Sequence, residues 1–399
     1  MGKRAGVLAE ESHAVIFHFN FSNYFKMLRL AWREDLLAVR CYFLAVLLLW
    51  VPPVSLFHAV CFFLDGILFP QMLRVKIEKP VFMVGHARSG TTLAHRLLLA
   101  DEDRFSAFML YELYFPSLLQ KKVIRVLAAL DRHYLSGFLE KRVQAWEARH
   151  YRSDAHEMGL TIPEEDDIVN YYSMASGFWM TKMPYMADLD FYHVDDWPQR
   201  KRERLFRFYS DCIRRELYLN GVEKTHLSKN PTFSGRVGSL LEFFPDARIV
   251  VNVRDPNETI PSLLKLLSRG YRQLGWSVDR QLESLRAMAD ISYDTYRDPF
   301  DVLEAHPDVP ASVIDYRELV SDPLAAVEKM YNDLELPMTD AYRALLAKEK
   351  KRAAEHSTTH TYSLDEFGLD RDEIHTRLAP LFERFGWVNP KTAPAEADV

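Results

Sequence analysis

The stretch from Val81 to Leu98 reads VFMVGHARSGTTLAHRLL, and it decides the predicted fold. Val81–Val84 is an apolar run typical of a buried strand, and Thr91–Leu98 has the composition of an apolar helix. A glycine-containing turn joins the two. Consecutive backbone N–H groups in such a turn can surround an anion at the positive end of the following helix. The stretch therefore predicts an α/β fold of the P-loop type, with an anion site after this strand.

The turn departs from the phosphate-binding consensus G-x-x-x-x-G-K-[ST] at one position. Gly85, Gly90 and Thr92 have the consensus spacing, but Thr91 stands where the consensus has lysine. The backbone cradle is therefore kept, whereas the lysine that contacts the γ-phosphate of a nucleoside triphosphate is missing. The turn also offers a guanidinium and a hydroxyl, from Arg88 and Ser89.

Composition restricts what this anion site can serve. The chain has 399 residues, of which 48% are hydrophobic, enough for a large core. Its formal net charge of −6 leaves no excess of Lys and Arg to neutralise a nucleic-acid backbone, so we expect no nucleic-acid partner. Three cysteines are too few for a disulfide framework and stand in no metal-ligand spacing, which favours a reducing compartment.

The N-terminal part of the chain contains a long apolar segment, Leu36–Pro70. Pro52 and Pro53 interrupt it near its middle, which predicts two helices of about 16 residues, each about 24 Å long. Because a bilayer core is roughly 30 Å thick, the pattern favours a hairpin that dips into one leaflet, with Trp50 at the headgroups. A soluble helical pair packed on the main domain or on a dimer partner is the alternative. Basic residues flank the segment: Arg29, Arg33, Arg40, Arg74, Lys76 and Lys79.

From Pro80 onward, short β-rich runs alternate with helical stretches, which predicts a three-layer fold with a mainly parallel central sheet covered by helices. Charged and apolar residues interleave at helical spacing in Lys121–Arg149 and Arg200–Leu219, so we expect amphipathic surface helices there. Five runs are candidate strands: Val81–Val84, Ser106–Leu110, Thr225–Ser228, Arg248–Val253 and Ser312–Asp315.

A second strand-to-helix junction strengthens the prediction of an anion site. Arg254 ends the strand Arg248–Val253, and Asp255-Pro256 has the pattern of a helix start with proline in the first turn. Ser262 follows Arg254 by eight residues. Both side chains could then reach one phosphate near the start of this helix.

The two junctions together resemble a known family. GHARSGTTL, followed far downstream by VRDPNETIPS, is similar to the sulfotransferases that use 3′-phosphoadenosine 5′-phosphosulfate (PAPS). The resemblance covers about Pro80 to Trp387, and it is nearest to the divergent group that includes bacterial members and shares features with protein-tyrosine sulfotransferases. Further fragments extend it: HEMGLTIPEED (156–166), HLSKNPTF (226–233), FFPDARIVVNVRDP (243–256), VIDYRELVSDP (313–323) and HTYSLDEFGL (360–369).

The resemblance implies a set of cofactor-binding residues. The first junction would bind the 5′-phosphosulfate through Arg88, Ser89, Gly90, Thr91 and Thr92. Arg254 and Ser262 would bind the 3′-phosphate, and Tyr316 in VIDYRELVSDP is added to the set. PAPS has no γ-phosphate, which accounts for the missing lysine at position 91. PAPS is then the co-substrate, and we expect no metal to be required.

Sulfuryl transfer needs positive charge near the sulfuryl oxygens and the departing phosphate. Lys229, in HLSKNP, ends a predicted strand and so lies at the same sheet edge as Arg88 and Arg254. The resemblance puts a lysine of this motif beside the sulfuryl group. We therefore expect Lys229 and Arg88 to be catalytic.

The reaction also needs a base for the acceptor hydroxyl or amine, and Glu112 is the expected one. It follows a predicted strand, 24 residues after Arg88, close to where the tyrosine-sulfating relatives carry a catalytic glutamate. His356 and His360 have the i, i+4 spacing of metal ligands but no third ligand nearby, so we expect a plain surface there. Four residues are alternative bases: His156, Glu157, Glu164 and Glu165.

These inferences divide the chain into three parts: a membrane-associated helical segment (1–75), a sulfotransferase domain (76–388) and a disordered tail (389–399). The expected partners are PAPS, a small-molecule or lipid acceptor and a membrane surface, with a homo-oligomer left open. Tyr171–Tyr192 supplies aromatic and apolar residues for an acceptor pocket, although the same stretch fits a core. We expect the catalytic domain to be cytoplasmic.

Two other functions compete with this interpretation. A P-loop kinase or nucleotide hydrolase would need a lysine at position 91 and a carboxylate to hold Mg²⁺; Asp255 is a candidate, but Arg254 beside it would compete with the metal. The second alternative is a non-catalytic, membrane-associated nucleotide-binding protein, which would keep the anion-binding loop after Val84 but would not transfer a sulfuryl group.

Overall fold

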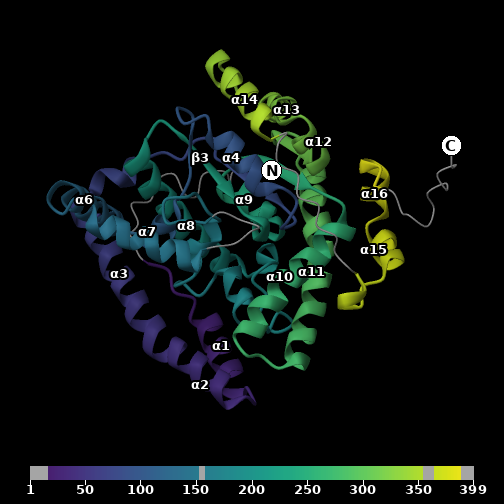
Figure 1. Cartoon of the computed structure of the whole chain (residues 1–399), viewed down its shortest axis with the longest axis horizontal. Coiled ribbons are helices and arrows are strands. Elements are labelled where there is room, and N and C mark those ends of the chain that lie inside the picture. The colour runs from purple at the N-terminus through teal and green to yellow at the C-terminus, as the bar shows by residue number, and fades with distance from the viewer. Residues whose placement is uncertain (1–16, 152–157, 354–363, 388–399) are drawn as a thin grey trace.

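A five-stranded parallel sheet lies at the centre of the computed structural model, which describes residues 17–151, 158–353 and 364–387 (Figure 1). The strand order β2-β3-β1-β4-β5 confirms the predicted parallel sheet. The strands are β1 (Val81–Gly85), β2 (Phe105–Ser106), β3 (Thr225–Lys229), β4 (Arg248–Val253) and β5 (Ala311–Asp315).

Helices cover both faces of the sheet, as the three-layer prediction requires. Successive side chains of a strand point to opposite faces, and β1 divides its residues accordingly. Val81 and Met83 belong to a core cluster with α4 (Thr91–Leu99) and α13 (Pro323–Asp333). Phe82 belongs to the larger cluster on the other face. The helices that contribute to this larger cluster include α8 (Gln199–Asn220), α9 (Val237–Phe243), α10 (Pro256–Gln273) and α11 (Val278–Ala305).

The strand predicted at Ser106–Leu110 is wrong in extent, since β2 ends at Ser106. The chain then leaves the sheet through a single antiparallel bridge from Met109 to Pro163. Helix α5 (Leu110–Tyr114) begins at once, because the Glu112 carboxylate accepts a hydrogen bond from the Met109 backbone N–H. This local contact starts a helical turn where the apolar pattern predicted strand.

The predicted amphipathic helices are present. Lys121–Arg149 corresponds to α6 (Leu118–Tyr134) and α7 (Phe138–His150), and Arg200–Leu219 lies within α8. The break between α6 and α7 falls at Ser136 and Gly137, which both have positive φ.

The remaining elements are four α-helices and six short helices. The α-helices are α12 (Tyr316–Ser321), α14 (Asp340–Ala353), α15 (Arg371–Arg377) and α16 (Ala379–Phe385). The short helices are η2 (Pro70–Arg74), η3 (Asp166–Asn170), η4 (Gly177–Thr181), η5 (Val194–Asp196), η6 (Pro231–Arg236) and η7 (Asp365–Phe367).

The N-terminal apolar segment forms one continuous helix, so the predicted break at Pro52-Pro53 is wrong. After α1 (Phe21–Arg33), the chain runs from Leu37 to Leu68 as α2 (Leu37–Ala45), a π-helical stretch (Val46–Trp50) and α3 (Val51–Leu68). The prolines fall in the first turn of α3, directly after the π-helical stretch. There the wider turn relieves the clash and the missing N–H that would break a regular helix.

By length and composition alone, this 32-residue helix could cross a membrane. Buried core helices of soluble proteins pass the same test, and here 28% of its most apolar window is buried inside the protein. The main core cluster includes Met27 of α1 together with Phe43, Leu47 and Phe62.

Some of the predictions fall outside the described residues. They concern His156, Glu157, His356, His360 and the tail 389–399.

Candidate active site

The loop between β1 and α4 is shaped by close contacts that require glycine. A Cβ on Gly85, which has φ +121°, would lie 2.1 Å from the Asn252 carbonyl oxygen of β4. A Cβ on Gly90, which has φ +84°, would lie 2.6 Å from the ring of Tyr316. Because neither position has room for a side chain, the loop is held against β4 and α12. Its last glycine is the N-cap of α4, so the first N–H groups of that helix face the loop.

Arg88 joins the two predicted anion sites. It has φ +74°, an uncommon conformation for a residue with a side chain. Its Nε donates a hydrogen bond of 3.2 Å to Oγ of Ser262 on α10. The strand-to-helix junctions at Gly85–Thr92 and Arg254–Ser262 are therefore in direct contact.

Ser89 plays a different part from its neighbour. Its side chain is completely buried, and its Oγ lies 2.5 Å from the His86 carbonyl oxygen and 3.1 Å from that of Asn252. These two carbonyl groups hold the hydroxyl within the protein. Ser89 thus fixes the loop to the end of β4.

Arg254 lies at the other side of this site. Its guanidinium is 4.2 Å from the centre of the Tyr316 ring, and its Nε donates to Glu258 at 2.8 Å. Tyr316 therefore touches both Gly90 of the loop and Arg254. Five of the predicted cofactor-binding residues thus form two sets of contacts. Arg88 contacts Ser262, and Tyr316 contacts both Gly90 and Arg254.

Lys229 lies at the carboxyl end of β3 and pairs in register with Met83, two residues before Gly85. Its side chain is 1% exposed. The ammonium nitrogen is 3.6 Å from Oε2 of Glu164 and 3.4 Å from Oε1 of Glu165. The structure therefore places a buried cation between two carboxylates at the same sheet edge as the loop.

Two buried ion pairs fix the segment that carries these carboxylates. Asp166 accepts from His226 of β3 at 2.9 Å, and Asp167 accepts from Arg236 at 3.2 Å. Both aspartate side chains are completely buried. The sequence PEEDD is thus held by its aspartates and presents its glutamates to Lys229, and it is not an exposed charge run.

Glu112 lies apart from Lys229 in the network of contacts. It is completely buried, and it accepts hydrogen bonds from the Tyr111 hydroxyl, from Arg125 and from Asn220. Asn220 ends α8 just before β3 begins, whereas Lys229 ends β3. The two ends of a five-residue strand are separated by about 13 Å. The structure does not bring Glu112 together with Lys229.

Two buried histidines near the loop were not singled out from the sequence. His86 stacks on Tyr296 with ring centres 5.1 Å apart, its Nε2 lies 3.0 Å from Oγ of Ser292, and burial lowers its pKa to about 4. Burial, followed by the charge of Lys229, lowers the pKa of His95 to about 3. Both rings are therefore neutral at pH 7, and they add no positive charge to the site.

Asn252 is a further residue that the sequence analysis missed. It pairs in register with Gly85, and both polar atoms of its side-chain amide are buried without a hydrogen-bond partner among the described residues. A buried amide without partners is costly unless something else satisfies it. The one polar residue in the run IVVNV was the available signal.

A family model described as the sulfotransferase family matches residues 80–340. The chain belongs to this family. It is 27% identical over 334 residues to omega-hydroxy-beta-dihydromenaquinone-9 sulfotransferase Stf3 of Mycobacterium tuberculosis and of Mycobacterium bovis, and the match covers 80% of this chain and 78% of those proteins.

Two crystal structures of mycobacterial sulfotransferases share the fold. STF9 from Mycobacterium avium has a TM-score of 0.66 at 18% identity, covering 94% of this chain and 98% of that one. STF1 from Mycobacterium tuberculosis H37Rv has a TM-score of 0.63 at 20% identity, covering 90% and 92%.

Family membership confirms the resemblance found in the sequence. The protein is a sulfotransferase, and this activity is supported over that of a kinase or nucleotide hydrolase. The family implies PAPS as the sulfuryl donor. Within residues 17–151, 158–353 and 364–387, no group of three or more His, Cys, Asp or Glu side chains is arranged to hold a metal ion.

Proposed function

We propose that this sulfotransferase moves a sulfuryl group from PAPS to a hydroxyl, or an amine, of a lipid or other amphiphilic acceptor. The observation that carries the proposal is the Arg88–Ser262 contact, which joins the two predicted anion sites beside the buried Lys229. The acceptor class is supported by the name of the relative, which sulfates a hydroxylated dihydromenaquinone. The exposed apolar surface of helix 37–68 supports it independently.

The residues present fit a donor with two separate anionic groups. Gly90, Thr91 and Thr92, with their backbone N–H groups at the start of α4, would hold the 5′-phosphosulfate. Arg254 and Ser262 would hold the 3′-phosphate. Tyr316 and Arg88 would connect the two subsites, and Ser89 would fix the loop. The unpartnered amide of Asn252 beside the loop is consistent with a polar ligand there.

Lys229 carries the main electrostatic role in this proposal. The donor supplies an activated sulfuryl group: the acceptor oxygen forms a new S–O bond, and the bond from sulfur to the bridging oxygen breaks. Adenosine 3′,5′-bisphosphate (PAP) is the leaving product. Lys229 donates to the oxygen on which negative charge develops, and burial strengthens this interaction. Arg88 adds a second positive charge.

For the base we propose the Glu164–Glu165 pair in place of Glu112. Both glutamates lie within 4 Å of Lys229, so a proton taken from the acceptor stays beside the reacting groups. Glu112 is instead enclosed by Tyr111, Arg125 and Asn220.

We further propose that the N-terminal segment associates with a membrane and that the catalytic domain is cytoplasmic, where bacteria make PAPS.

The first experiment tests the donor site by calorimetry with PAP and with AMP, which lacks the 3′-phosphate. PAP should bind more tightly. Equal affinity would remove Arg254 and Ser262 from the proposed site. A screen of labelled sulfuryl transfer into a lipid extract then identifies the acceptor.

Replacing Arg254 with Ala should weaken PAP binding by about 1.5–3 kcal/mol, the scale of a hydrogen bond to a charged group, and leave AMP binding nearly unchanged. Arg269→Ala is the matched control, because Arg269 is exposed on α10, the helix that follows Arg254. If both variants lose PAP affinity equally, the effect is general charge and not a 3′-phosphate contact.

A further inference from the structure

Three helices carry exposed apolar stripes outside the active site. On α3, the stripe has the helical spacing i, i+4, i+7, i+11, and each of its residues is about half exposed or more: Leu56, Val60, Phe63 and Ile67. On α6, the spacing is similar: Val123, Leu127, Leu130 and Tyr134. On α7, the stripe is Leu139, Val143 and Trp146. We call the three stripes together the apolar face.

Helix α7 shows most clearly that this face lacks a partner. It has 13 residues and none of them is buried. Isolated helices of that length are marginal in water, and most helical stability in proteins comes from packing an apolar side against something. In the described protein, the stripe of α7 packs against nothing that buries it.

The stripes of α3 and α6 belong to one rigid unit. Asp65 of α3 accepts hydrogen bonds from the backbone N–H groups of Leu118 and Leu119, at 2.9 and 2.7 Å, at the start of α6. It also accepts from Arg215 of α8 at 2.8 Å, and both charged side chains are essentially unexposed. Figure 1 shows α3, α6 and α7 together at one side of the molecule.

Polar contacts hold helix 37–68 to the enzyme along most of its length. The Leu47 carbonyl accepts from the Tyr24 hydroxyl, Oγ of Ser55 donates to the Tyr172 carbonyl, and His58 contacts Gln120. From Leu47 to Asp65 the helix rises about 27 Å. A bilayer core is roughly 30 Å thick, so a perpendicular crossing would carry the body of the enzyme into the hydrocarbon. The helix therefore has to lie along the membrane surface.

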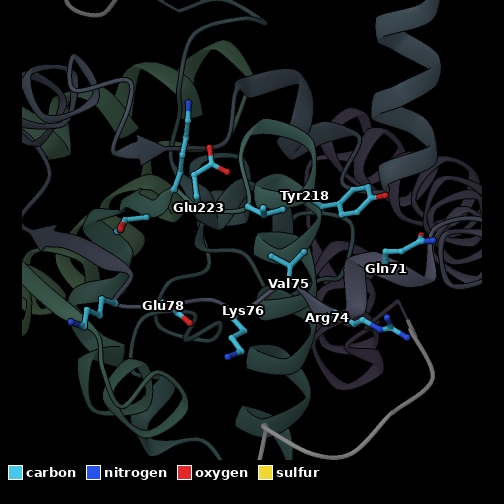
Figure 2. Close-up of a pocket in the computed structure, with 11 residues that line it drawn as sticks. Gln71, Arg74, Val75, Lys76, Glu78, Tyr218 and Glu223 are labelled. Carbon is cyan, nitrogen blue, oxygen red and sulfur yellow. The ribbon is translucent and has the colours of Figure 1, made fainter.

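A cavity of about 630 Å³ lies where helix 37–68 ends (Figure 2). Four cations line it: Arg74, Lys76, Lys79 and Lys224. Two carboxylates, Glu78 and Glu223, line the same cavity, so four cations and two anions leave its lining with two excess positive charges. The cavity thus combines excess positive charge with the end of an apolar helix, which is the complement of an anionic lipid surface.

We infer that the apolar face lies in one leaflet of an anionic bilayer, with helix 37–68 parallel to the membrane surface and the cationic cavity against lipid phosphates. This inference rests on the membrane association proposed above, and it adds α6 and α7 as a second contact that the N-terminal segment alone does not supply.

The first test measures binding of the full chain to phosphatidylcholine vesicles with and without phosphatidylglycerol. Leu127→Glu and Leu139→Glu should each weaken binding by roughly tenfold, because each removes an inserted leucine and adds a charge. Leu345→Glu is the matched control, since Leu345 is exposed to a similar degree on α14, away from α3 and α6 in Figure 1. Equal binding by all three variants would overturn the role of α6 and α7.

A second variant tests the cavity. The pair Lys76→Ala and Lys224→Ala should lower affinity for the phosphatidylglycerol vesicles by about fivefold per lysine. Binding to phosphatidylcholine alone should stay unchanged. A loss on both kinds of vesicle would assign the effect to folding and remove the cavity from the inference.

The orientation of helix 37–68 relative to the membrane is tested with nitroxide labels on three variants, Leu37→Cys, Leu49→Cys and Ile67→Cys. Each variant also carries Cys41→Ser, because Cys41 is exposed. A helix along the surface gives the three labels similar shallow depths. A crossing helix puts Leu49→Cys deep and the other two in water, and that result would overturn the inference.

The alternative to a membrane is that a second copy of the chain covers the apolar face. A dimer in solution that ignores vesicles and dissociates in Leu127→Glu would overturn the inference. PAP calorimetry on the same variants separates the membrane proposal from the proposed donor site. The apolar-face variants should bind PAP normally. If the wild type fails to bind PAP, the proposed donor site is wrong, and the vesicle results still test the membrane contact.

Discussion

Arg88 is held in a left-handed backbone conformation that costs a residue with a side chain about 1–2 kcal/mol. Such a conformation persists only where its surroundings determine it. Ser89, fixed to β4 on one side, and Ser262, contacted on the other, provide those surroundings. The single residue thus links the sheet, the loop and α10.

Lys229 is the residue at which transition-state charge is expected to be stabilised. Replacing it with Met keeps the buried length but removes the charge, and kcat should fall by about 10²–10³-fold. Affinity for PAP should change much less. Lys265→Met is the control, since Lys265 forms a partly exposed pair with Glu366. A variant with normal kcat and weak PAP binding would make Lys229 a binding residue only.

The base can be identified from pH profiles. Glu165→Gln or Glu164→Gln should lower kcat/KM by about 10²–10⁴-fold and abolish the acidic limb of the profile, because a general base is lost. Glu112→Gln should keep that limb and instead lower the free energy of unfolding by about 1–3 kcal/mol, since buried donors lose their acceptor. The reverse pattern would return the base to Glu112.

At the scale of elements, His226 ties β3 to η3 and α8 through Asp166 and Glu216, at 2.9 and 3.2 Å. Burial alone would lower the pKa of His226, but the charges and hydrogen bonds of these two carboxylates outweigh it and raise the pKa to about 9. The folded state therefore holds a proton that the unfolded state releases near pH 6.5. The resulting stabilisation is complete below pH 6.5 and is lost as pH rises toward 9.

Urea unfolding should accordingly show stability falling between pH 6.5 and 9, on the order of 1 kcal/mol per pH unit. His226→Gln should make this dependence clearly shallower without abolishing it, because His193, with its pKa raised to about 10 by hydrogen bonds to Asp190 and Asp294, contributes in the same direction. A wild-type stability that rises over this range would contradict the raised pKa of His226.

Local patterns were enough to predict some elements and not others. The apolar run at Arg248–Val253 and the glycine spacing at Gly85 and Gly90 predicted β4 and the loop, because these features depend on neighbours in sequence. The continuity of helix 37–68 depends on a π-helical stretch held by contacts to Tyr24 and Tyr172. No pattern within the segment encodes those distant partners, so the two prolines were read as a break.

The site was predictable to a similar degree. Motif spacing and the family resemblance pointed to Arg88, Arg254 and Ser262, and the fold brings Arg88 into contact with Ser262. Glu112 contacts Asn220, which precedes β3, whereas Lys229 ends β3. This separation depends on the path of the chain between residues 112 and 220. Sequence distance from Arg88 carried no information about that path.

At the scale of the molecule, the N-terminal helices and the catalytic core share one hydrophobic cluster. Deleting residues 1–70 would remove Phe43, Leu47 and Phe62 from it and leave Arg215 buried without Asp65. We expect the truncated chain to aggregate or to lose cooperative unfolding, since removing one partner of a buried ion pair alone costs about 3–5 kcal/mol.

Thermal unfolding and gel filtration check this expectation. Deletion of residues 1–16 is the control, because it leaves the described core intact. A stable, monomeric chain lacking residues 1–70 that still binds PAP would show that the segment is a separable part.

The order of the strands also has a consequence for synthesis. Central strand β1 pairs with β3, and Val81 and Leu227 are 146 residues apart. At about 5–20 residues per second, the ribosome needs roughly 7–30 s to make the chain between them. Helix 37–68 therefore emerges long before α8, its buried partner, exists. In that interval the side of the helix that packs on α8 in the folded protein is uncovered. The membrane association proposed above would cover it before the sheet is complete.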